Sequence, residues 1–188
     1  MGYSISWLVT SGADAQTLPE RLGLKPTGEK GDFFDFKASG QPLKNGGYLL
    51  VMERCDHPFI RDESMARISA DGEALACSLE EHVMYAGASQ WKQGKKLWSI
   101  THQGNREETR YAITVTGAPP GPFAAIRDDC AKKQLSDKQV DWYFEIPLQL
   151  AKQLTGFKHD ENCTGIDGNF AEFAEPVGAA KPWWRFWG

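Results

Sequence analysis

Residues 74 to 116 carry the pattern that most constrains the fold of this chain. Three stretches within them, 74 to 85, 95 to 103 and 109 to 116, have the residue pattern typical of strands. Turn residues separate these stretches at Lys92-Gln93-Gly94 and at Gly104-Asn105. Strands joined by such short turns pair antiparallel. We therefore predict an α+β fold with a mainly antiparallel sheet and a central three-stranded meander.

Further elements are expected on both sides of the meander. Strands are predicted at 3 to 10, at Phe33, Phe34 and Phe36, at 48 to 52 and at 141 to 146. Helices are predicted at 14 to 22, 60 to 69, 122 to 134 and after Pro147. In the third helix, Cys130 shares a face with Phe123 and Ile126, which predicts a core thiol. Three to four helices are thus expected to pack on the sheet.

The length of 188 residues suits one compact domain that buries most of its apolar surface without disulfide or metal support. We predict a single domain over 1–188. Its last stretch, 160–188, is rich in turn residues and ends in aromatic side chains. We expect this stretch to be an irregular aromatic C-terminal tail.

The charge balance argues against a nucleic-acid partner. The chain has 21 Lys+Arg and 25 Asp+Glu, which gives a formal net charge of −4. Binding along a phosphate backbone needs clustered cations. The short basic clusters, such as Lys95 with Lys96, are typical of a solvated surface.

The remaining composition indicates a cytoplasmic protein. No apolar run approaches the roughly 20 residues that span a bilayer, so no membrane span is expected. The four cysteines are widely separated, as expected for reduced thiols. No Gly-x-Gly-x-x-Gly, phosphate loop or Gly-x-Ser-x-Gly motif occurs, so no nucleotide cofactor or serine hydrolase is indicated. We expect no cofactor, and the sequence carries no signal for an oligomeric state.

Two ionisable residues interrupt an apolar face of the meander. If the turn lies at 92 to 95, paired residues sum to about 187, and Tyr85 faces His102. Glu81 and His102 then share a face with apolar neighbours, while His82 lies on the opposite face. Glu81 and His102 are then either a buried pair whose hydrogen bonds are satisfied or a general acid and base. Glu81, His82 and His102 are therefore the candidate catalytic residues, although a slip of one residue would exchange the faces.

A second cluster joins two predicted loops. Cys55-Asp56-His57 follows one strand, and His159-Asp160-Glu161-Asn162-Cys163 follows a helix. Loop side chains from distant parts of a chain can converge on a binding site. We take Asp56, His57 and His159 as candidate binding residues. The spacing matches no established zinc motif, so no metal ligand is assigned.

The end of the chain is unusually aromatic for a terminus. Trp183, Trp184, Phe186 and Trp187 lie within five positions, together with Arg185. Leaving so much apolar area in water is costly, so the tail packs on its own domain or binds a partner. These five residues are the remaining candidate binding residues, with a protein partner as the class of ligand.

The sequence favours a non-catalytic intracellular binding protein of regulatory, adaptor or immunity type. This prediction depends on the absence of a catalytic motif, the acidic composition and the aromatic tail. One alternative is a small, hydrolase-like enzyme that uses Glu and His as acid and base. Another is a metal-binding protein that uses the Cys and His loops.

Overall fold

A nine-stranded antiparallel sheet with four helices forms the fold, which confirms the α+β prediction. The computed structural model describes residues 2–12, 14–105, 108, 111–166 and 168–175. The strand order across the sheet is β2-β9-β3-β4-β1-β5-β6-β7-β8. The strands are β1 (Ser4–Ser11), β2 (Lys25–Gly31), β3 (Ala38–Pro42), β4 (Tyr48–Glu53), β5 (Glu73–Glu80), β6 (Tyr85–Lys92), β7 (Lys95–Gln103), β8 (Ile113–Gly117) and β9 (Phe170–Ala174). The helices are α1 (Leu18–Arg21), α2 (Asp62–Ile68), α3 (Pro122–Ser136) and α4 (Trp142–Thr155).

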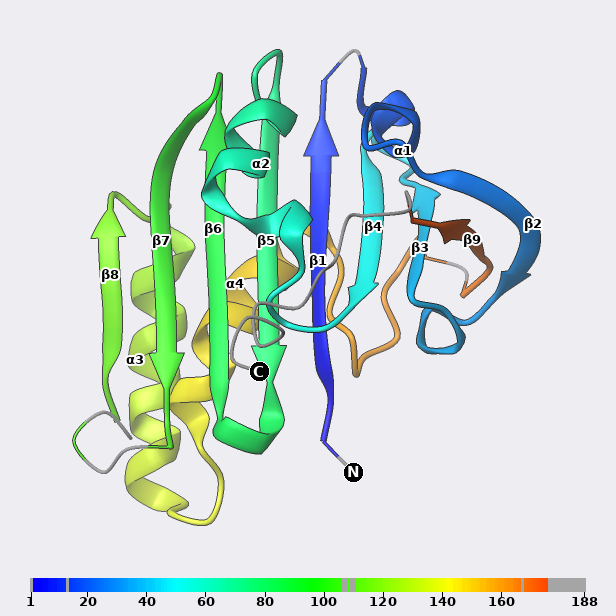
Figure 1. The fold of residues 1–188 in the computed structure, drawn as a ribbon. Coiled ribbons are helices and arrows are strands. Elements are labelled where there is room, and N and C mark those ends of the chain that lie inside the picture. Colours follow the sequence, from blue (N-terminus) through cyan, green and yellow to red (C-terminus); the bar gives the residue numbers. More distant parts are fainter. Residues whose placement is uncertain (1, 13, 106–107, 109–110, 167, 176–188) are drawn as a thin grey trace, which may run out of the picture.

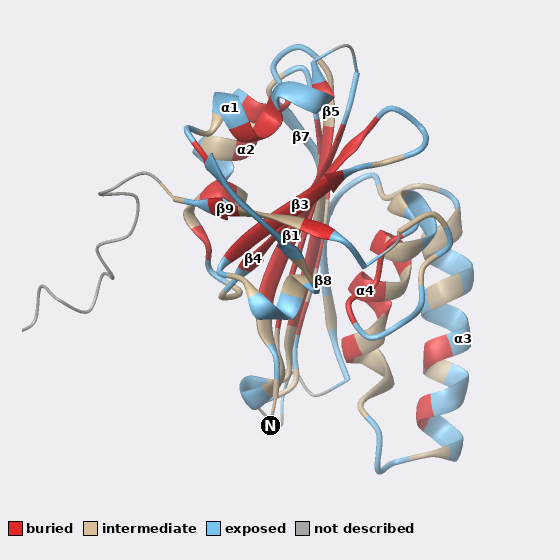
Figure 2. Ribbon diagram, turned by 90° about the vertical axis from the view of Figure 1, so that its right-hand side faces the viewer, coloured by how far each residue is buried: buried red, intermediate tan, exposed pale blue. Residues whose placement is uncertain are grey.

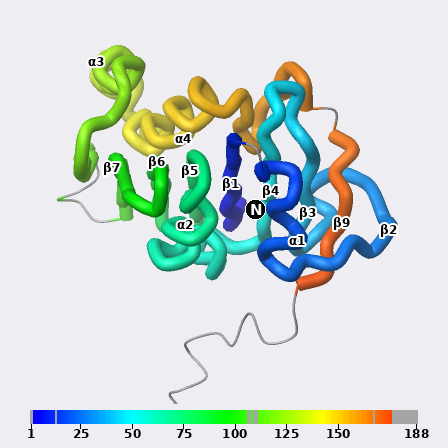
Figure 3. The backbone as a smooth tube through the Cα atoms, turned by 90° about the horizontal axis from the view of Figure 1, so that it is seen from above, coloured from blue at the N-terminus to red at the C-terminus, as the bar shows by residue number. Residues whose placement is uncertain are grey.

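The helices cover both faces of the sheet and make three layers (Figure 1). We call the face that carries α1 and α2 the front face and the face that carries α3 and α4 the back face. Seen from above, the two pairs of helices lie on opposite sides of the strands (Figure 3). Four short 3₁₀ turns, η1 (Ala15–Thr17), η2 (Phe33–Asp35), η3 (Pro58–Ile60) and η4 (Glu81–Val83), connect these elements.

Each face of the sheet has its own apolar core, because alternate residues of a strand point to opposite faces. On the back, Trp7, Cys77 and Ile100 pack with Leu148 of α4. On the front, Leu8, Leu50, Ala76 and Met65 of α2 form the second core. The buried residues therefore follow the middle of the sheet on both sides (Figure 2). The run at 48 to 52 is fully buried, as expected for a central strand.

The predicted meander is present, but it has four strands, β5 to β8. The stretch predicted as one strand over 74 to 85 ends at Glu80, because η4 and the left-handed Met84, with φ of 49°, reverse the chain. The predicted register holds only beside the turn. A bulge between Gln90 and Trp91 shifts the pairing by one residue, so His102 faces Ala86 instead of Tyr85.

Residues 141 to 146, predicted as a strand, begin helix α4 instead. The carboxylate of Asp141 accepts hydrogen bonds from the N–H groups of Tyr143 and Phe144, at 3.1 and 3.2 Å. This N-cap satisfies two donors that a helix start otherwise leaves free. Pro147 therefore lies inside the helix and does not begin it.

The aromatic segment at 33 to 36 is also not a strand. Asp32 accepts a hydrogen bond from the N–H of Phe34 at 3.0 Å and starts η2. Phe33 then packs edge-on against Phe157 and Phe170 on the back face, and Phe34 stacks against another ring. The local turn and these ring contacts outweigh the strand preference of aromatic residues.

The segment predicted to be irregular contains β9, which pairs with both β2 and β3. Phe170 and Phe173 of β9 are buried on opposite faces, and this burial gives the strand its place in the sheet. Among the described residues, no helix is long and apolar enough to cross a membrane.

Candidate functional site

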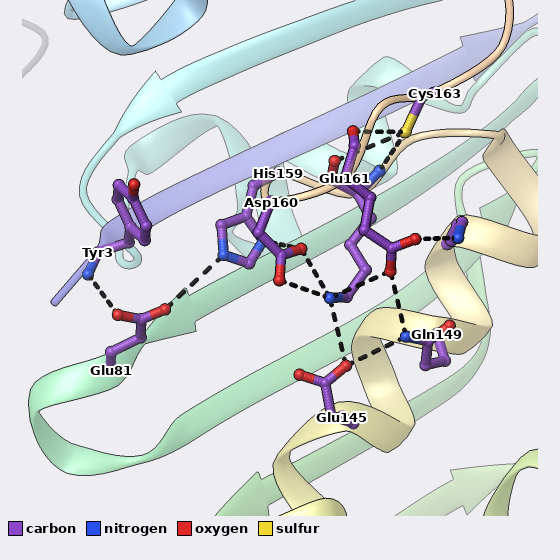
Figure 4. A network of polar contacts seen from close by, with 10 residues as sticks. Tyr3, Glu81, Glu145, Gln149, His159, Asp160, Glu161 and Cys163 are labelled. Carbon is purple, nitrogen blue, oxygen red and sulfur yellow. Dashed lines mark hydrogen bonds and ion pairs between the residues drawn. The ribbon is translucent and has the colours of Figure 1, made fainter.

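A dense polar cluster surrounds Lys158, which follows the end of α4 at Thr155. Figure 4 shows the carboxylates of this cluster, Glu145, Asp160 and Glu161. The side chain of Lys158 is only 3% exposed. Its Nζ lies 2.6 and 2.9 Å from the two carboxylate oxygens of Asp160, 3.3 Å from Glu145 and 3.4 Å from Glu161. Lys152 also pairs with Glu161. One buried cation thus joins α4 to the loop through three carboxylates.

The charges in this cluster set the pKa values of its members. Burial acts to lower the pKa of Lys158, but the hydrogen bond to Asp160 and the charge of Glu145 outweigh it and raise the pKa. Burial acts to raise the pKa of Asp160, whereas the hydrogen bond from Lys158 lowers it overall. The hydrogen bond from Lys152 lowers the pKa of Glu161. All of these groups are therefore charged at neutral pH, as a structural ion-pair network requires.

Next to this network, the side chains of Glu81, a candidate catalytic residue, and His159, a candidate binding residue, are neighbours. Oε1 of Glu81 lies 3.8 Å from Nε2 of His159, and Oδ1 of Asp160 lies 3.7 Å from Nδ1. The ring is buried against Tyr3 and Trp7, and neither nitrogen has a hydrogen-bond partner in the described structure. Burial lowers the pKa of His159, and the charges of Asp160 and then Glu81 oppose this shift without outweighing it, so the ring is neutral at pH 7.

His102 pairs with Asp141, which was not predicted as a site residue. Its Nε2 lies 3.0 Å from Oδ2 of Asp141, and its Nδ1 lies 2.8 Å from the carbonyl oxygen of Ala112. The His102 side chain is fully buried. Because the other carboxylate oxygen of Asp141 caps α4, His102 connects β7 and β8 to the start of that helix. Both ring nitrogens are engaged in holding these elements together.

His57 is a buried residue of the front face. Its Nδ1 accepts a hydrogen bond from the N–H of Phe59 at 3.3 Å, and Nε2 lies 3.3 Å from Oε1 of Glu175 without the alignment of a hydrogen bond. Burial lowers the pKa of His57, and Glu175 opposes this shift. Asp56 beside it forms an exposed ion pair with Arg54 at 2.8 Å. These contacts hold the loop between β4 and α2.

His82 is the one candidate histidine with an exposed side chain, at 65%. Its Nδ1 lies 2.6 Å from Glu80, the residue that ends β5. Glu81 accepts a hydrogen bond from the N–H of Tyr3 at 2.9 Å. Glu81, His82 and His102 therefore make separate contacts and form no acid–base couple with one another.

The two Cys and His loops do not converge on a shared site. His57 contacts Phe59, which belongs to the front core, whereas His159 contacts Trp7, which belongs to the back core. The sheet separates them. Within the described part of the chain, no group of three His, Cys, Asp or Glu side chains is placed to hold a metal ion.

A different surface emerges on the front of β5 to β8. Pairing places Ala76, Ser89, Ser99 and Thr116 in one row across four strands. The adjoining row, Ser78, Gly87, Thr101 and Thr114, is polar or small as well, and Tyr85 lies two residues before Gly87 on β6. We call this surface the hydroxyl patch, and its members are Ser78, Tyr85, Gly87, Ser89, Ser99, Thr101, Thr114 and Thr116.

The hydroxyl patch contains a shallow groove of about 180 Å³. Asp62 and Lys96, which form an ion pair of 2.7 Å, line it beside α2. The ring of Tyr85 lies over Gly87, where an added Cβ would meet the phenol oxygen at 2.8 Å. Burial raises the pKa of Tyr85, so the phenol keeps its proton at neutral pH. In Figure 1 no helix covers β7 and β8 on this side.

Sequence reasoning missed the hydroxyl patch and Lys158. The signal for the patch was the alternation of hydroxyl and apolar residues at 99 to 101 and 113 to 116. The signal for the network was the run of four charged or ionisable residues at 158 to 161. The candidate residues Trp183, Trp184, Arg185, Phe186 and Trp187 lie outside the described residues.

Comparisons with known proteins find no match to this chain among protein-family models, curated proteins or solved structures.

Proposed function

We propose that this chain is a non-catalytic intracellular binding protein of regulatory, adaptor or immunity type, and that the hydroxyl patch is its binding surface. The observation that carries the proposal is the row of Ser89, Ser99 and Thr116 on β6 to β8, which no helix covers over β7 and β8 (Figure 1). Tyr85 lies over Gly87 at one end of this surface.

The composition of the patch suits recognition of another protein. Tyrosine supplies rigid contact area at a low entropic cost, and serine and glycine adapt their hydrogen bonds to a partner. Ser99 and Thr116 share a hydrogen bond of 2.7 Å between their hydroxyls, and both groups have further capacity to donate or accept. The patch is therefore polar without carrying a buried charge that a partner would have to neutralise.

The placement of the histidines favours binding over catalysis. A general acid and base should meet at the bottom of a concave pocket. Five surface cavities formed by the described residues, the groove of the hydroxyl patch among them, have no histidine in their linings. The His102–Asp141 pair holds secondary-structure elements together and lies below the surface.

Site-specific photo-crosslinking in the source cells tests this proposal. A benzophenone amino acid at Thr114, on the patch, should give a discrete adduct with another protein. The same group at Leu135, 83% exposed on α3, is the matched control and should not. In the Thr114 probe chain, a Ser99→Glu substitution should abolish the adduct. Equal adducts from both positions, or none from Thr114, would contradict the proposal.

A further inference from the structure

The hydroxyl patch is small for a complete protein–protein interface. Four strands spaced by about 4.8 Å and rows covering roughly five residues of 3.3 Å each give about 320 Å². A standard interface uses about 800 Å² of each partner. A short peptide segment therefore fits this patch better than a whole globular surface.

The described chain ends on the same side of the sheet as the patch. Glu175 follows β9 and contacts His57, which packs with Phe59 of η3 on the front face. Ile60, the last residue of η3, lines the groove. The segment after Glu175 thus starts on the front face, on the β4–α2 connection that leads to the groove.

The length of that segment matches the distance to the groove. From β9 to β6 the strand order has five steps, which at about 4.8 Å each is roughly 24 Å. From Glu175 to Trp183 the chain has eight residues, which extend to about 26 Å. Trp183 and Trp184 can therefore reach β6, and the aromatic residues after them can reach β7.

The chemistry of the segment also fits. Trp183, Trp184, Phe186 and Trp187 are the kind of large side chains that anchor short recognition segments. A floor of glycine, alanine and hydroxyl residues allows aromatic rings to lie flat on the sheet. Asp62 lines the groove and pairs with Lys96, while Glu80 is the strand neighbour of Tyr85 and contacts the exposed His82. The groove thus has two carboxylates nearby. The segment brings two cations, Lys181 and Arg185.

From these observations we infer that residues 183–187 dock in cis on the hydroxyl patch. The inference rests on the proposed function, because it assigns an occupant to the same binding surface. A partner protein then has to displace the aromatic segment or present a similar one. The segment is a built-in competitor for the surface.

Photo-crosslinking of the full-length chain tests this inference. A benzophenone amino acid at Trp184 should form an intramolecular adduct to peptides from 73–103, with a yield that does not depend on protein concentration. A Thr101→Arg substitution should reduce the yield at least about tenfold, the change that 1.4 kcal/mol produces. The control Leu135→Arg, on α3, should leave the yield unchanged.

A second measurement avoids any effect of patch substitutions on folding. In the full-length Trp183→Ala/Trp184→Ala variant, amide resonances of Ser78, Gly87 and Thr101 should shift relative to the wild type. Adducts on α1 or α2, adducts only between copies, or no amide shifts at the patch would overturn the inference. Adducts from Thr114 to another protein would still support the proposed function, so the two failures are distinguishable.

Discussion

Replacing Lys158 with methionine removes the one buried cation that three carboxylates share, and it keeps most of the side-chain volume. Breaking a buried ion pair by removing one partner costs about 3–5 kcal/mol. The carboxylates of Glu145, Asp160 and Glu161 are 22%, 44% and 34% exposed, so water can partly replace the lysine. We therefore expect the free energy of unfolding to fall by about 2–4 kcal/mol.

Urea unfolding followed by tryptophan fluorescence measures this loss. A fall of about 3 kcal/mol corresponds to a melting temperature lower by roughly 6–12 °C for a chain of this size. The matched control is Lys152→Met, because Lys152 is 36% exposed and, among the described residues, forms its ion pair with Glu161 alone. An exposed pair is worth less than about 1 kcal/mol. If Lys158→Met costs no more than Lys152→Met, the reasoning is refuted.

The pH dependence provides a second check on the same network. The pKa values of Asp160 and Glu161 are lowered in the fold, so their contribution is present above about pH 4 and is lost as the pH falls through the folded values. The pKa of Lys158 is raised, so its contribution is present below about pH 10.4 and is lost above the folded value. The stability difference between wild type and Lys158→Met should therefore be flat around neutrality and shrink at both extremes.

Three further outcomes are expected. Because the pKa of His159 is lowered in the fold, its contribution to stability is present above about pH 6.5 and should be lost as the pH falls. In urea unfolding, His159→Gln should reduce the change of the unfolding free energy with pH by up to about 1.4 kcal/mol per pH unit. An unchanged pH dependence would contradict this. Asp141→Ala should cost about 2–4 kcal/mol, since it removes a helix cap and leaves buried His102 without its carboxylate. Asp141→Asn should cost less, because the amide oxygen can still cap the helix; equal losses would contradict this and assign the effect to the lost charge. Cys77 and Cys130 are buried, so Ellman's reagent should titrate at most two of the four thiols quickly in the native protein and all four in guanidinium.

Local patterns predicted the elements whose own residues determine their structure. The apolar run at 48 to 52 and the strand at 95 to 103 needed no information from elsewhere in the chain. The turn at Lys92-Gln93-Gly94 was predicted from its residue types, and Gln93 and Gly94 both adopt positive φ in the structure. The presence of an antiparallel sheet followed directly from these segments.

Elements that depend on distant contacts were predicted less well. Residues 141 to 146 have the aromatic content of a strand, yet Gln134 of α3 accepts a hydrogen bond from the N–H of Trp142 while Asp141 caps the helix. The bulge at Gln90 and Trp91 leaves no mark in the residue types, so the pairing of His102 was displaced by one position. A shift of this size changes which side chains can meet.

In the candidate site, too, single residues could be predicted from the sequence, whereas contacts between distant residues could not. Individual polar residues such as Glu81, His102 and His159 could be identified from the sequence as unusual. Their partners could not, because Asp141 is 39 residues from His102 and Glu81 is 78 residues from His159. Sequence separation of this size carries no information about distance until the order of strands is known.

The position of β9 also fixes when the sheet can be completed during synthesis. β2 has one neighbour in the sheet, β9, and Lys25 pairs with Ala174, 149 residues later. At about 5–20 residues per second, a ribosome needs roughly 7–30 s to make the chain between them. Through that interval β2 has no strand to pair with, although β1, β4 and β5 to β8 are already available to one another. Of the strands that the structure describes, the last to leave the ribosome is thus the one that joins the second strand to the sheet.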